Sequence, residues 1–130
     1  MKPIRNAVDL AEARSQPRAF IFLWVNWAIQ ARQSQKTVER LVVSWKAACP
    51  EVLIPAYIVD LSDGSGELWE AVRDWLRDEH QPVDSLTYGG GGALLWVMAG
   101  SVIAHCPFTA QIDNAKLLAT TRERLLLNET

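Results

Sequence analysis

The sequence predicts an α/β fold in which a mixed central sheet lies between helices on both of its faces. Apolar runs of strand length alternate with segments of helical periodicity. The run 18–25 is apolar at nearly every position, which is typical of a strand buried on both faces. Two short apolar runs in the last third meet at a tight turn and predict a hairpin. The expected order is β-α-β-α-β-α-β-β-α. It fills residues 1–130 as a single domain without an internal linker or repeat.

The N-terminal segment predicts a short edge strand at residues 3–6 and then a short helix at 8–15. Gln16 and Pro17 end this helix, because proline cannot continue the hydrogen-bond ladder. The buried side of the helix is expected to hold Leu10 with Ala11 or Ala13.

The segment 28–48 predicts one long helix, which Pro50 ends. Its first part, Gln30 to Lys36, is almost entirely polar and should face solvent, and Asn26 or Ser34 is the expected N-cap. The apolar stripe of this helix follows a helical spacing and contains Val38, Leu41, Val42, Trp45 and Ala48.

A strand beginning at Ala56 precedes a turn at 62–66, where Ser65 is the expected cap of the next helix. That helix has an apolar stripe made of Leu68, Ala71, Val72, Trp75 and Leu76. The hairpin strands are 93–98 and 101–105. Thr109 is the expected cap of a last helix, whose inward side chains should be Ile112, Ala115, Leu118 and Leu125 or Leu126.

Composition excludes several classes of function. A formal net charge of -2 leaves no basic surface for nucleic acid or an anionic membrane. No apolar run reaches the length that spans a bilayer, and no apolar leader precedes the domain, so we expect a soluble, cytoplasmic protein. Two histidines and two widely spaced cysteines do not form a metal-binding pattern, so no metal or cofactor is expected.

The local motifs resemble those of the thioredoxin family over nearly the whole chain. Where that family has Phe-Trp-Ala-x-Trp-Cys-x-x-Cys-Lys, this chain reads Leu23-Trp24-Val25-Asn26-Trp27-Ala28-Ile29-Gln30-Ala31-Arg32. The strand ending Ile58-Val59-Asp60-Leu61 matches a second family segment, and the run from Gly91 to Gly100 matches a third. The resemblance implies a thioredoxin-like three-layer α/β/α fold.

The departures from the family pattern fall on its reactive groups. Ala28 and Ala31 stand where the resemblance implies the two sulfurs of the dithiol. Phe22 takes the place of a buried acid, Gly92 that of a cis-proline, and Lys36 that of a helix proline. Disulfide exchange needs an attacking thiolate and a second, resolving sulfur. The sequence therefore predicts a redox-inactive member of this fold, not an enzyme, with no catalytic residues at the usual site.

The leading hypothesis is a binding or adaptor domain for a protein or peptide partner. Its groove would consist of Trp27, Ala28, Ile29, Gln30, Gly91 and Gly92. The two glycines could offer main-chain hydrogen bonds to an added strand; a plain flexible loop is the competing interpretation. A phosphate loop at 89–92 is disfavoured, because a strand and not a helix follows it.

Two alternatives stay open. Cys106 or Cys49 could serve a single-cysteine thiol enzyme or redox sensor, although both are readily interpreted as buried cysteines. His105 and Cys106 are neighbours on one strand and should point to opposite faces, which disfavours a catalytic pair. The other alternative is a structural or self-associating domain with tryptophans at a subunit contact. Asp60 and Asp63, near the functional edge of the sheet, are interpreted as turn residues.

Overall fold

A five-stranded mixed sheet forms the centre of the molecule in the computed structural model, which describes residues 1–83, 92–107 and 109–126. The strand order is β1-β3-β2-β4-β5. The strands are β1 (Lys2–Ile4), β2 (Arg18–Trp24), β3 (Ala56–Asp60), β4 (Ala93–Met98) and β5 (Ser101–Cys106). β1, β3 and β2 are parallel, whereas β4 runs antiparallel to both of its neighbours. The predicted edge strand, central strand and hairpin are confirmed.

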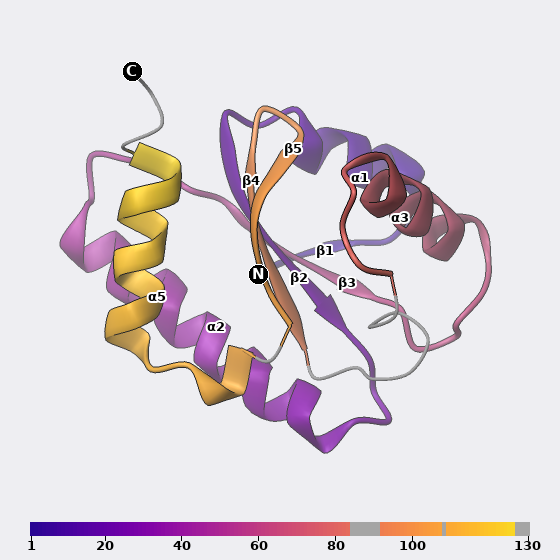
Figure 1. Ribbon diagram of the computed structural model, residues 1–130, viewed down its shortest axis with the longest axis horizontal. Coiled ribbons are helices and arrows are strands. Elements are labelled where there is room, and N and C mark those ends of the chain that lie inside the picture. Colours follow the sequence, from indigo (N-terminus) through magenta and orange to yellow (C-terminus); the bar gives the residue numbers. More distant parts are fainter. Residues whose placement is uncertain (84–91, 108, 127–130) are drawn as a thin grey trace.

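Helices cover both faces of this sheet (Figure 1). α1 (Ala7–Arg14) and α3 (Glu67–Asp78) pack on one face, and α2 (Ile29–Ala48) and α5 (Asn114–Thr121) pack on the other. A 3₁₀ turn, η1 (Thr109–Gln111), precedes α5, and a π-helical turn, η2 (Arg122–Leu126), follows it. The order and the three layers agree with the predicted fold class.

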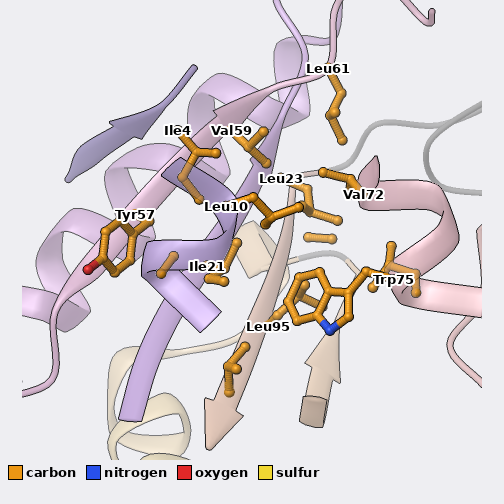
Figure 2. Packing of buried hydrophobic residues seen from close by; sticks show 14 of the residues in the cluster. Ile4, Leu10, Ile21, Leu23, Tyr57, Val59, Leu61, Val72, Trp75 and Leu95 are labelled. Atoms are coloured by element: carbon orange, nitrogen blue, oxygen red, sulfur yellow. The ribbon is translucent and has the colours of Figure 1, made fainter. Parts of the chain in front are cut away.

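The alternation of side chains along β2 divides the core into two parts. Ile21 and Leu23 point toward α1 and α3, whereas Phe20 and Phe22 point toward α2 and α5. Figure 2 shows the first part, where Trp75 of α3 packs against strand side chains. All of these β2 side chains are buried, so the sheet is anchored from both sides.

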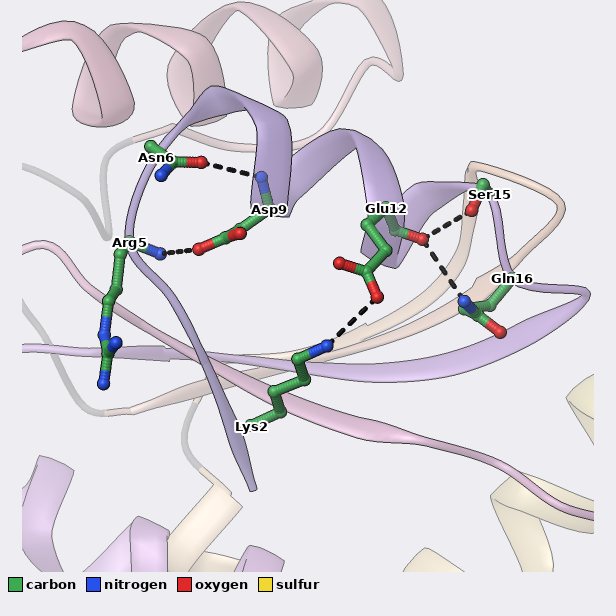
Figure 3. Close-up of polar contacts among 7 residues, drawn as sticks. All are labelled: Lys2, Arg5, Asn6, Asp9, Glu12, Ser15 and Gln16. Carbon is green, nitrogen blue, oxygen red and sulfur yellow. Dashed lines mark hydrogen bonds and ion pairs between the residues drawn. The ribbon is translucent and has the colours of Figure 1, made fainter.

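The start of α1 follows from its sequence. The Asn6 side chain accepts a hydrogen bond from the Asp9 N–H at 2.8 Å, and the Asp9 carboxylate accepts one from the Arg5 N–H at 2.9 Å (Figure 3). This reciprocal arrangement satisfies N–H groups at the helix start. Of the two alanines considered for its buried side, Ala13 is buried and Ala11 is exposed.

Three predicted caps are wrong. α2 begins after Ala28 without a side-chain cap, and α3 begins after Gly66 rather than Ser65. α5 begins after Asp113, whose carboxylate accepts the N–H bonds of residues 115 and 116. Thr109 lies earlier, in η1. Of the side chains expected to face inward, Leu125 is buried and Ile112 and Leu118 pack against the core, whereas Ala115 is exposed. Leu117 and Thr121 are buried in addition.

The polar start of α2 does not face solvent entirely. Ala31 and Ser34 are fully buried and continue the stripe of Val38, Leu41 and Trp45 toward the N-terminus of the helix. Ala48, expected on this stripe, is exposed. The stripe therefore begins two turns earlier and ends one turn earlier than the apolar residues alone indicate.

Candidate functional site

The segment that joins β2 to α2 lies at the carboxyl end of the central strand, and backbone hydrogen bonds hold it there. The Leu61 N–H donates to the Trp24 carbonyl at 2.8 Å, and the Asn26 N–H donates to the Ser62 hydroxyl at 2.7 Å. The Asp60 carboxylate accepts from both the N–H and the hydroxyl of Ser62. Asp60 therefore orders the turn that supports this segment, as predicted for a turn residue.

Two apolar side chains at this point face solvent. Trp27 is 55% exposed and Ile29 is 74% exposed, whereas Ala28 between them is half-buried. Gln30 follows as another exposed residue. We call Trp27 and Ile29 the Trp27–Ile29 patch. Exposed apolar side chains that gather in one contiguous patch mark contact surfaces, whereas scattered ones do not.

Gly92 precedes β4, next to Ser34 of α2, and has a backbone conformation that L-residues rarely adopt, with φ of +78°. A Cβ atom at this position would come within 2.5 Å of the Ser34 Cβ and 3.1 Å of a Phe22 ring carbon. The family resemblance implies a cis-proline here. The space and the backbone conformation instead require glycine.

The carbonyl of Gly92 is already bonded within the chain. It accepts hydrogen bonds from the Thr109 hydroxyl at 2.9 Å and from the Thr109 N–H at 3.4 Å. The Ser34 hydroxyl accepts from the Ala110 N–H at 3.0 Å. Ser34 and Thr109 are both fully buried, and together with Gly92 they close the space between the start of α2 and η1.

Sequence reasoning missed this polar cluster, because it treated Ser34 and Thr109 as helix caps. The signal was present: Ser34 lies three residues after Ala31 and four before Val38, on the buried stripe of α2. Gly91, the remaining predicted groove residue, lies outside the described residues.

A cavity of about 690 Å³ opens at the carboxyl ends of β1, β3 and β2, next to the start of α3. Ligands in α/β folds commonly bind at such an edge. Its charged lining residues are one cation and three carboxylates, namely Arg5, Asp60, Asp63 and Glu67. These mixed charges do not select one class of ligand. None of the described groove residues lines this cavity.

Two tryptophans line the same cavity with indole N–H groups that are buried. Neither Trp24 nor Trp69 has a hydrogen-bond partner for this group within the part of the chain that the structure describes. The Arg73 guanidinium lies 5.2 Å from the centroid of the Trp69 ring and so makes a cation–π contact with it. The Trp69 ring thus already has a stabilising contact within the chain.

The two cysteines lie at opposite ends of the molecule. Cys49 follows α2, whose twenty residues extend about 30 Å from the Trp27–Ile29 patch. Cys106 pairs with Leu94, which pairs with Phe22 near the carboxyl end of β2. They form no disulfide, and this topology prevents one within a single chain.

His105 and Cys106 point to opposite faces of the sheet, as predicted. His105 is paired with Leu95 and Cys106 with Leu94, and these two leucines belong to different parts of the core. The Nε2 atom of His105 is buried without a hydrogen-bond partner among the described residues. Burial lowers the pKa of His105 below its ordinary value of 6.5.

This pKa predicts a loss of stability in mild acid. Below about pH 6.5 the unfolded chain binds a proton at residue 105 that the folded chain does not bind. The free energy of unfolding therefore decreases as the pH is lowered. We expect the Tm to fall by a few degrees less in His105→Leu than in the wild type between pH 7.5 and pH 5. The exposed His80 offers the control His80→Asn, which should retain the wild-type slope. Equal slopes in all three proteins would contradict this assignment.

The described residues contain no group of three or more side chains that could hold a metal ion. None of the described helices is long and apolar enough to cross a membrane. The start of α2 thus presents exposed apolar side chains.

The fold is thioredoxin-like. The structure aligns with thioredoxin of Fasciola hepatica at a TM-score of 0.63 and 18% identity, covering 95% of this chain and 99% of that chain. It aligns with the germline-specific thioredoxin Deadhead of Drosophila melanogaster at a TM-score of 0.58 and 13% identity, covering 95% and 98%. Thioredoxin O2 of Arabidopsis thaliana gives a TM-score of 0.56 and 11% identity, covering 94% and 91%. No protein-family model matches the sequence, and neither does any curated protein.

Proposed function

We propose that this chain is a thioredoxin-like binding domain that performs no dithiol–disulfide exchange and contacts a protein or peptide partner at the start of α2. The observation that carries the proposal is the exposure of Trp27 and Ile29 beside two alanines, at the place where the fold resemblance implies a dithiol. The candidate contact residues are Trp27, Ala28, Ile29, Gln30 and Gly91. Gly92, also predicted for the groove, is buried and its carbonyl is bonded to Thr109.

The absence of sulfur at positions 28 and 31 supports the redox part of the proposal. An alanine cannot form or resolve a mixed disulfide. The distance between the two cysteines supports it further, because neither one has a second sulfur nearby to resolve an intermediate. We propose that the domain works in the cytoplasm, where cysteines without a disulfide remain reduced.

The binding part of the proposal rests on the contrast between a rigid support and an exposed surface. Hydrogen bonds from Leu61 and Asn26 fix the segment before the patch, so Trp27 follows a backbone that is held at a defined position. Exposed aromatic side chains on a fixed backbone lose little conformational freedom on binding. Because the Gly92 carbonyl already accepts a hydrogen bond from the Thr109 hydroxyl, an added strand would have to bond to other main-chain groups.

A peptide-display selection tests the binding proposal. We expect extended peptides selected on the wild type to lose roughly 10-fold or more in affinity for Trp27→Ala and Ile29→Ser, as for a central apolar anchor. Val43 is also apolar and exposed and lies on α2, so Val43→Ser is the matched control and should bind normally. Peptides that bind all four proteins equally would refute a site at the Trp27–Ile29 patch.

An insulin-reduction assay tests the redox proposal separately. We expect the wild type with dithiothreitol to be no faster than dithiothreitol alone, and Ala28→Cys/Ala31→Cys to accelerate the reaction. Thiol titration without denaturant addresses the alternative, a single-cysteine enzyme or sensor. Wild-type insulin reduction that is abolished by replacing Cys106 or Cys49 would establish that alternative and overturn the redox proposal.

A further inference from the structure

A second cavity of about 690 Å³ lies at the other end of the sheet from the Trp27–Ile29 patch. It opens between the last turns of α2, the connection 50–55 and the first residues of β2 and β3. We call it the Trp45 cavity. Its volume is in the range of pockets that bind small molecules.

The walls of the Trp45 cavity are mainly apolar. They include Val42, Trp45 and Cys49 of α2 and its C-cap, and Val52, Leu53 and Ile54 of the connection. The Trp45 indole N–H donates to the Val52 carbonyl at 3.0 Å, so this polar group is already satisfied. Leu53 is 77% exposed, which leaves an apolar side chain at the rim. These walls suit a hydrocarbon chain.

The charged residues that line the cavity all have the same sign. They are Lys2, Arg18 and Lys46, and none of the lining residues is a carboxylate. Lys2 forms an exposed ion pair with Glu12 at 3.0 Å (Figure 3), and the Arg18 Nε–H donates to the Leu125 carbonyl at 2.8 Å. Lys46 has no ion pair within the described residues. It is therefore the cation best placed to receive an anionic group.

We infer that the Trp45 cavity binds a long-chain carboxylate, with the hydrocarbon tail against Trp45 and the carboxylate at Lys46. Burial of each methylene of the tail is favourable, so the tail supplies affinity. The lysine charge then selects an anionic head over a neutral or cationic one. This binding is independent of the proposed function, because none of the described groove residues lines the cavity.

Titration calorimetry with dodecanoate below its critical micelle concentration tests the inference. We expect dodecanoate to bind the wild type, and 1-dodecanol and dodecyltrimethylammonium to bind roughly 3- to 10-fold more weakly. Lys46→Glu should lower dodecanoate affinity by a similar factor and leave dodecanol unchanged. Lys116→Glu makes the same charge change at an exposed lysine of α5 and should bind as the wild type does.

A variant that fills the cavity tests the position of the tail. Val52→Trp places a large side chain on the connection, and it should abolish binding of both dodecanoate and dodecanol while retaining the wild-type circular dichroism spectrum. Val8→Trp, at an exposed site on α1, is the control for the added ring and should bind normally.

Three results would overturn the inference. One is equal affinity for the anionic and the neutral chain; another is dodecanoate binding that survives Val52→Trp. The third is cosedimentation with anionic phospholipid vesicles in the absence of binding to monomeric dodecanoate, which would indicate a membrane surface in place of a free acid.

Discussion

Gly92→Ala is expected to destabilise the domain by about 3 kcal/mol. The new Cβ atom would lie 2.5 Å from the Ser34 Cβ, which is part of a fully buried side chain, so α2 and β4 would have to move apart. The substitution also places a side chain at a φ of +78°, which is costly by itself. Urea denaturation of the wild type and the variant measures the difference.

Gly64→Ala separates the two causes. Gly64 has a φ of +65°, similar to that of Gly92, but a Cβ atom there would have no heavy atom within 4 Å. We expect a loss of only about 1 kcal/mol, from backbone strain alone. If the two variants were equally stable, contact with Ser34 would not be what requires glycine at position 92.

Trp96→Ala is expected to cost about 4 kcal/mol, the largest effect among these substitutions. Trp96 lies on β4, is only 2% exposed and packs among the side chains of β2, α2 and α5. Its removal leaves a large cavity. It also removes the indole N–H that donates to the buried Thr121 hydroxyl at 2.9 Å. Thr121 keeps one bond, since its hydroxyl donates to the Leu117 carbonyl at 2.7 Å.

Trp27→Ala is the matched control for this loss. It removes the same side chain from a position that is largely exposed, so we expect a change within about 0.5 kcal/mol. The two variants can be compared by chemical denaturation with a far-ultraviolet circular dichroism signal, which reports mainly on the helices. A large loss of stability in Trp27→Ala would mean that this residue belongs to the core and not to a contact surface.

The order of strands and helices could be predicted because the spacing of apolar residues along the chain reflects which side chains are buried. β2 is apolar at most positions since helices cover both of its faces, and the hairpin of β4 and β5 is marked by Ala99 and Gly100. These features depend on local sequence alone. They gave the predicted fold class without knowledge of any long-range contact.

The helix starts could not be predicted in the same way. Asn26, Ser34, Ser65 and Thr109 are all residues that favour caps, yet none of them caps the helix expected of it. Ser34 and Thr109 bond instead to groups that are distant in sequence, Ala110 and Gly92. A cap competes with every other partner that the fold brings near, and single-sequence patterns do not contain those partners.

The candidate groove stays a prediction, and the buried contacts of Gly92 could not be predicted from the sequence. The exposure of Trp27 and Ile29 agrees with a surface role, whereas the bonding of Gly92 within the chain had no counterpart in the sequence reasoning. The Trp45 cavity was missed as well. Its walls come from segments that no shared motif connects, so only the folded chain brings them together.

The position of β2 between β3 and β4 has a consequence for how the Trp27–Ile29 patch can move. Both edges of β2 are hydrogen-bonded, and Phe20, Ile21 and Phe22 are fully buried, so the strand should open only when the whole domain unfolds. The start of α2 has no side-chain cap and can fray by itself. The Trp27–Ile29 patch therefore lies between β2, which should open only on global unfolding, and the uncapped start of α2, which can fray. Ile29 can adapt to a partner while the backbone that leads to Trp27 keeps its place.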